Sequence, residues 1–210
     1  TKNKIEGFST KDKSLKDKII LITGSSKGFG FEIAKLLNPH NCRLIIVGRD
    51  HKGVKESEDI LKKNNENVKG LVADFTNTDD IYKMVDDAIK EWGHIDVVIN
   101  MPIITKGSRF LASKDVNDLK KEQAVNFEAL FLINQLVIKN MKKKKINGRV
   151  INVTTISAKH TSTNKSSGSD ILTKNMIEKY TQMMAEEHYK DKIALVVLRL
   201  DNKIGSSTFD

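Results

Sequence analysis

Cysteine is almost absent from this sequence of 210 residues, in which Cys42 stands alone. One cysteine cannot form an internal disulfide, so nothing here calls for an oxidising compartment. Long apolar runs are also lacking: no stretch approaches the roughly 20 residues of a membrane span, and no secretory signal is recognisable. We therefore expect a soluble intracellular protein of the cytoplasm or an organelle matrix. The first residue is Thr1 rather than Met, which is compatible with the removal of an organelle-targeting sequence, such as a mitochondrial one.

Acidic residues are also fewer than basic ones: the sequence has 27 Asp and Glu and 36 Lys and Arg, which gives a net charge of +9. A basic balance favours acidic partners, nucleic acid included. Most of the lysines are scattered, and the dense run 142–145 ends a predicted helix, where cations meet the negative end of the helix dipole. We therefore disfavour nucleic-acid binding, and we predict no metal site.

The sequence does contain a regular alternation of short β-branched runs and longer helical segments. Strands are predicted at 18–23, 43–47, 68–72, 95–100, 149–154 and 193–198. Helices are predicted at 29–37, 52–64, 78–92, 114–141 with a break, and 170–189. This repetition predicts a parallel sheet covered on both faces, which is a three-layer α/β/α sandwich. We expect one domain over 18–210, preceded by a polar, lysine-rich arm at 1–17.

The helical stretch Val125–Met141 differs from the others, because apolar residues surround it on all sides. Such a helix must be buried on more than one side. The domain's own core and a subunit interface explain this pattern equally well. Together with the helix 170–189, it is a candidate contact for a protein partner or a second copy of the chain.

A glycine-rich loop lies between the apolar run 19–22 and the first helix, and it reads Thr23-Gly24-Ser25-Ser26-Lys27-Gly28-Phe29-Gly30. Glycines let backbone amides approach a pyrophosphate, and the following helix presents its positive N-terminal end to that charge. A motif placed after a first strand and before a helix favours dinucleotide binding over a plain turn.

The loop matches the Thr-Gly-x-x-x-Gly-x-Gly signature of the short-chain dehydrogenase/reductase family, and the chain resembles that family over about residues 15–200. The resemblance implies a Rossmann-type, doubly wound sheet with strand order 3-2-1-4-5-6. Since the sequence stops at Asp210, we expect the fold to be truncated after strand 6. The loop positions that the resemblance assigns to the cofactor are Thr23, Gly24, Ser26, Lys27, Gly28, Phe29 and Gly30.

The resemblance also implies a choice of cofactor. Gly48 stands where NAD-preferring members of the family carry an acidic residue for the adenosine ribose. Arg49 and Lys27 resemble the basic pair that NADP-preferring members use on the 2′-phosphate, a group that needs positive charge. The expected cofactor is therefore NADP(H).

Further positions match the family in order. Asp74, followed by Phe75, resembles the aspartate that meets the adenine amino group. Asn100 resembles the first asparagine of the Asn-Asn-Ala-Gly motif beside the cofactor. Asn126 resembles the helix asparagine that holds a water for a proton relay.

The family's reactive end is poorly matched. Met101-Pro102-Ile103 replaces Asn-Ala-Gly, which should crowd the nicotinamide pocket. The Tyr-x-x-x-Lys pair reads Asp170-x-x-x-Lys174, so the lysine survives and the tyrosine does not. Thr155 by strand alignment, or Ser157 by spacing to the helix, occupies the place of the catalytic serine.

Loss of a positioned general acid costs about 10² to 10⁴ in rate. Asp170 lies one helical turn from Lys174, so we expect the two charges to pair and quench each other. The first hypothesis is a catalytically impaired member of the family that retains NADP(H) binding and acts as a structural or regulatory subunit. The alternative is an active NADP(H)-dependent oxidoreductase whose proton comes from His160 or from a water chained through Asn126 and Lys174.

Overall fold

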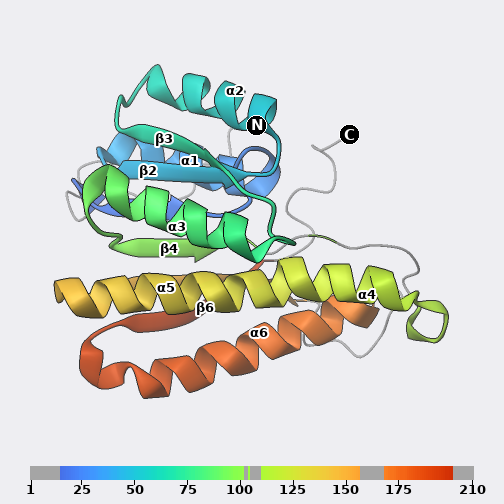
Figure 1. Cartoon of the computed structure of the whole chain (residues 1–210). Coiled ribbons are helices and arrows are strands. Elements are labelled where there is room, and N and C mark those ends of the chain that lie inside the picture. Colours follow the sequence, from blue (N-terminus) through green and yellow to red (C-terminus); the bar gives the residue numbers. More distant parts are fainter. Residues whose placement is uncertain (1–14, 102–103, 105–109, 157–167, 201–210) are drawn as a thin grey trace.

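The strands form one parallel sheet. The computed structural model describes residues 15–101, 104, 110–156 and 168–200. Within them lie β1 (Ile19–Ile22), β2 (Arg43–Gly48), β3 (Val68–Val72), β4 (Val97–Asn100), β5 (Arg149–Thr155) and β6 (Ala194–Leu200). Their order in the sheet is β3-β2-β1-β4-β5-β6 (Figure 1). The predicted doubly wound Rossmann topology is confirmed, whereas the expected truncation after strand 6 concerns residues 201–210, outside the described part of the chain.

Helices cover both faces of the sheet (Figure 1). The described helices are α1 (Gly28–Leu37), α2 (His51–Lys62), α3 (Thr78–Trp92), α4 (Val116–Gln123), α5 (Ala129–Lys144) and α6 (Gly168–Glu187). Ile20 and Ile22 of β1 pack in a cluster with residues of α1 and α2, whereas Ile19 and Leu21 pack in a second cluster with residues of α3 and α5. Because both faces are covered, all four residues of β1 are buried, which explains its uninterrupted apolar run.

The break predicted within 114–141 is a π-helical turn at Ala124–Glu128. Beyond it, α5 buries one face against the sheet and packs beside α3. The rings of Phe127, in the π-helical turn, and of Phe131, in α5, contact the ring of Tyr180 in α6 at centroid distances of 5.8 and 5.4 Å. Intrachain contacts therefore account for most of the apolar surface of this helix, and Phe131 remains 39% exposed.

The lysine run 142–145 closes α5 as the sequence indicated. Lys142 forms an ion pair with Asp191 at 2.8 Å, and Lys145 takes a left-handed conformation at the C-cap of the helix. In the described part of the chain, no helix is both long enough and apolar enough to cross a membrane.

Candidate functional site

Ser25 fixes the course of the glycine-rich loop. Its N–H donates to the Val47 carbonyl at 2.8 Å, and its hydroxyl donates to the Ile22 carbonyl at 2.6 Å while accepting from the Val47 N–H at 2.9 Å. Thr23 accepts from the Met101 N–H at 2.9 Å through its hydroxyl. The loop is thus tied to the ends of β1, β2 and β4. Sequence reasoning did not select Ser25, because a small polar residue in such a loop has no distinguishing local signal.

Two glycines of the loop are required by its backbone. Gly24 has a φ of +60° and lies against the Met101 carbonyl, so a side chain there would be strained and crowded. A Cβ on Gly30 would overlap the Gly24 backbone. The loop and the first turn of α1 therefore pack backbone to backbone, as the signature motif requires.

Helix α1 begins without a side-chain cap from any described residue, since Lys27 at its N-cap makes no capping hydrogen bond. By contrast, Asp50 caps α2, Asn77 caps α3 and Asp115 caps α4. The first amide groups of a helix need acceptors. Since the N-cap residue of α1 does not cap them, those of α1 could bind an external anion, and the helix dipole adds positive potential at the same place.

The residues predicted to bind the adenosine end of the cofactor lie beside the loop, at the carboxyl ends of β2 and β3. Ser26 and Val54 fill the space above Gly48, so a Cβ on that glycine would collide with both. Arg49 is exposed and near enough to help lower the pKa of Asp74, although the main cause of that low pKa is the hydrogen bonds from Thr76. Phe75 is partly buried against the core.

Asn100 is 1% exposed and belongs to a buried network of amides. Its Nδ2 donates to the Oδ1 of Asn134 at 2.7 Å and to the Oδ1 of Asn152 at 2.9 Å. Asn152 in turn donates to the Thr181 hydroxyl at 2.9 Å. The network joins β4, β5, α5 and α6, so the Asn100 amide group braces the core, and its predicted contact with the cofactor stays a prediction.

Asn126 holds the chain just after β4. Its Oδ1 accepts from the Ile104 N–H at 2.9 Å, and its Nδ2 donates to the Ile104 carbonyl at 2.7 Å. Each end of its amide is thus engaged by Ile104, and its predicted role in holding a relay water stays a prediction. Asn126 lies in a π-helical turn, a feature that often occurs at functional sites.

The reactive end centres on the first turns of α6. Lys174 is 3% exposed, and burial lowers its pKa while Asp170 opposes that shift. Burial also raises the pKa of Asp170, with Lys174 opposing it. The expected ion pair between the two is not formed: among the described residues the Asp170 carboxyl makes no hydrogen bond or ion pair, and Lys174 attracts it only through space.

Thr155 lies at the carboxyl end of β5, where the family's serine is expected. Its hydroxyl oxygen is buried and has no hydrogen-bond partner among the residues that the structure describes. Ser157 and His160, the two other predicted groups of this end, lie outside those residues, as do Pro102 and Ile103. Tyr180, which burial gives a raised pKa of about 12, contacts two phenylalanine rings between α5 and α6.

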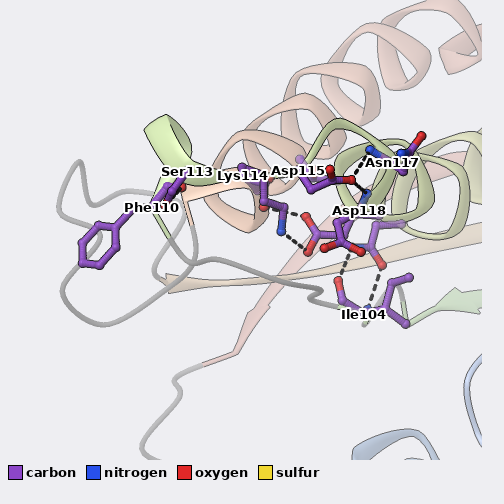
Figure 2. A network of polar contacts seen from close by, with 11 residues as sticks. Ile104, Phe110, Ser113, Lys114, Asp115, Asn117 and Asp118 are labelled. Carbon is purple, nitrogen blue, oxygen red and sulfur yellow. Dashed lines mark hydrogen bonds and ion pairs between the residues drawn. The ribbon is translucent and has the colours of Figure 1, made fainter.

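A further polar cluster, which sequence reasoning missed, lies where α4 begins. Figure 2 shows Lys114 beside this turn, with Asp115 facing the amides of Asn117 and Asp118 that it caps at 2.8 and 3.3 Å. Lys114 reaches inward and forms an ion pair with Glu122 at 2.7 Å. No group of metal-binding side chains occurs within the described ranges.

Comparison with known families gives one assignment over most of the chain. Residues 18–200 match the family model described as short chain dehydrogenase. The 3-oxoacyl-[acyl-carrier-protein] reductase of Vibrio cholerae is 29% identical over 140 residues, which cover 67% of this chain and 55% of that protein. The protein of the same name from Buchnera aphidicola is 32% identical over 142 residues, covering 67% of this chain and 56% of the relative. The chain thus spans about half the length of these relatives.

An uncharacterised oxidoreductase of Staphylococcus epidermidis is 30% identical over 179 residues, 82% of this chain and 72% of that protein. The fold recurs in 3-ketoacyl-(acyl-carrier-protein) reductase from Brucella melitensis complexed with NADH, with a TM-score of 0.81, 23% identity and coverage of 90% and 77% of the two chains. L-Sorbose reductase from Gluconobacter frateurii, complexed with NADPH and L-sorbose, gives a TM-score of 0.82 at 18% identity, covering 90% and 70%. At such identities the structural likeness shows the fold alone.

Proposed function

This chain belongs to the short chain dehydrogenase family, and on that premise we propose that it binds NADP(H) but is impaired in the family's proton transfer, acting as a structural or regulatory subunit of a larger assembly. The uncapped start of α1 carries the proposal, because its amides and the glycine loop are free to receive a pyrophosphate. Solved relatives of the same fold are complexed with NADH and NADPH.

The preference for NADP(H) rests on the residues around β2. Lys27 and Arg49 are both exposed beside the loop and offer positive charge to a 2′-phosphate. The acidic residue that would favour NAD has no room at Gly48, where Ser26 fills the space. One oxygen of Asp74 is occupied by Thr76, which leaves the other for an adenine amino group.

The impairment follows from the tyrosine that is missing. NADP(H) would supply a hydride, but a reduced carbonyl also needs a proton. The carboxyl of Asp170 sits close to the helix backbone, whereas a tyrosine hydroxyl lies across a phenyl ring, so the two groups cannot occupy the same place. Without a positioned acid, turnover should fall by about 10² to 10⁴.

A second candidate function is an active NADP(H)-dependent oxidoreductase with a rearranged proton donor. The state of Asp170 favours it: burial raises the pKa of this carboxyl, and no described residue occupies it by hydrogen bond or ion pair. A carboxyl in that state can donate a proton through an intervening water. Lys174→Met, which keeps side-chain volume, should abolish turnover if this candidate is correct and leave assembly unchanged if the first one is.

The partner surface that we propose comprises α5 and α6, which contain most of the segments 125–141 and 170–189. Four large apolar side chains of these helices remain exposed, and they are Phe131, Leu172, Met176 and Met183. Exposed apolar side chains that gather on neighbouring helices mark protein contacts more often than scattered ones do. A second copy of the chain or a different protein would bury them.

The first experiment is a titration of the purified protein with NADPH and NADH, followed by cofactor fluorescence and thermal stability. We expect NADPH to bind more tightly and to stabilise the fold, by about 2.7 kcal/mol at a hundredfold excess over Kd. Arg49→Ala should weaken NADPH binding and spare that of NADH. The matched control is Arg149→Ala, at the amino end of β5, which should change neither. Failure of both cofactors to bind would contradict the proposal.

A further inference from the structure

Glu122 is a fully buried carboxylate whose two oxygens are both engaged. Its Oε1 pairs with the Lys114 ammonium at 2.7 Å, and its Oε2 accepts from the Ser169 hydroxyl at 2.5 Å. The side chains of Lys114 and Glu122 are only 4% and 1% exposed. Ser169 directly precedes Asp170 in the first turn of α6, so this contact joins α4 to the turn that carries the reactive end.

We propose that Glu122 is a positioning residue of the site, which clamps the first turn of α6 through Ser169 and sets its negative charge beside Asp170. The inference rests on the second candidate function, the active oxidoreductase with a rearranged proton donor. It assigns to a residue of α4 the task of keeping a carboxylic acid available where the family has its tyrosine.

The energetics of buried charge support a role other than stability. Removing two ions from water costs several kcal/mol each, and a buried pair often contributes no more than apolar residues of the same volume would. A pair such as Lys114–Glu122 is therefore better explained by the position that it imposes. Here it imposes the register of α4 against α6, at the one turn that holds Asp170.

The electrostatics act in the same direction. Among the described residues, the charged groups that act on Asp170 are Lys174 on its own helix and Glu122 on α4, and Glu122 is itself paired with Lys114 just before α4. Burial is the main reason that the pKa of Asp170 is raised, Glu122 raises it further, and Lys174 opposes both. The negative charge of Glu122 thus offsets part of the effect of Lys174, whose positive charge favours the ionised form of Asp170.

The chemistry needs that proton. When a carbonyl carbon accepts hydride, the electron pair of its C=O bond moves onto oxygen. That oxygen takes a proton from a bridging water, and the water is reprotonated by the Asp170 carboxyl. Asp170 is left as a carboxylate, which regains its proton from solvent before the next turnover. The carbonyl group would thus be reduced to an alcohol, with hydride added at carbon and the proton at oxygen, and the nicotinamide cofactor would be the two-electron reductant.

The test measures the pKa of Asp170 directly, by carboxyl-carbon NMR titration of the whole chain, with Asp170→Asn to assign the resonance. Glu122→Gln keeps the shape of the side chain and removes its charge, and its amide oxygen can still accept one of the two hydrogen bonds that Glu122 accepts from Lys114 and Ser169. We expect it to lower the pKa of Asp170 by about one unit or more, a tenfold weaker hold on the proton. Glu58→Gln on the distant α2 is the matched control and should leave that pKa unchanged.

A second variant covers the case in which Glu122→Gln fails to fold. Lys114→Met together with Glu122→Leu replaces the pair by apolar groups of similar size and should keep the thermal stability. It should still lower the pKa of Asp170, because the charge of Glu122 is the one that reaches it. An unchanged Asp170 pKa in folded variants would overturn the inference. If the variants do lower the pKa of Asp170 but the wild-type protein shows no turnover, the second candidate function alone is rejected.

Discussion

Gly48 has no room for a side chain, because Ser26 and Val54 lie directly over it. An acidic residue placed there would have to displace Ser26, which belongs to the cofactor loop. The absence of a side chain at Gly48 therefore has two effects: it removes the ribose contact of an acidic residue, and it leaves the space that Ser26 of the glycine-rich loop occupies. Cofactor preference at this position thus depends on two residues that lie far apart in the sequence.

Gly48→Asp should consequently weaken NADPH binding by about tenfold or more, the equivalent of about 1.4 kcal/mol, without creating NADH binding. Fluorescence titration with each cofactor measures both effects. The double variant Gly48→Asp with Ser26→Gly relieves the collision and should gain NADH binding. Tight NADH binding by the single variant would show that the loop yields easily and that this packing does not matter.

Cys42 is the other residue whose surroundings make a clear prediction. Its thiol is fully buried and donates to the Leu37 carbonyl at 3.3 Å, and burial raises its pKa to about 11. Because the thiolate is the reactive form, Cys42 should resist thiol-specific reagents at pH 8 in the native protein and react at once in denaturant. Rapid labelling of the native protein would mean that the β2 end of the core opens readily.

At the scale of elements, the Asn100–Asn134–Asn152–Thr181 network links two strands of the sheet to two helices. The three asparagines and the threonine are all buried. Buried amides are costly unless they are paired, so each member depends on the others. The network therefore fixes how α5 and α6 sit on β4 and β5, and with them the place of Lys174.

Asn152→Ala removes one of the two acceptors of Asn100 and the donor to Thr181, and it leaves a cavity. We expect a loss of about 3 kcal/mol in the free energy of unfolding, measured by urea denaturation. Asn117→Ala, at an exposed position of α4, is the control and should change stability by less than about 0.5 kcal/mol. Equal effects of the two changes would mean that the amide network adds nothing to stability.

At the scale of the whole molecule, we propose assembly through α5 and α6, because these helices leave large apolar side chains exposed. Met176→Glu with Met183→Glu should shift the protein toward monomer in sedimentation or light scattering, while NADPH binding stays as it was. Leu36→Glu, at an exposed position of α1 on the opposite face, is the matched control. If both variants and the unaltered chain have the same mass, α6 is not the interface.

Much of the architecture could be predicted from the sequence because its signals are local. Alternating apolar runs and amphipathic segments gave the six strands and their covering helices, and the segments 68–72 and 78–92 match β3 and α3 residue for residue. The glycine loop was recognisable because a tight turn before a helix requires particular residues at particular spacings. Both signals come from residues that are close together in the sequence, so they can be recognised without the tertiary contacts.

The polar contacts of the site depended on the tertiary structure, because their partners are distant in sequence. Glu122 and Ser169 are separated by 47 positions, and Asn100 and Asn152 by 52. Spacing alone also predicted an ion pair between Asp170 and Lys174, yet the two buried side chains do not pair and interact only electrostatically. The sequence by itself determined the family fold and predicted that Asp170 stands at the tyrosine position. Only the packing of α4 against α6 decided that the charge of Glu122 lies near Asp170, since a buried charge takes its partners from whichever segments the fold brings together.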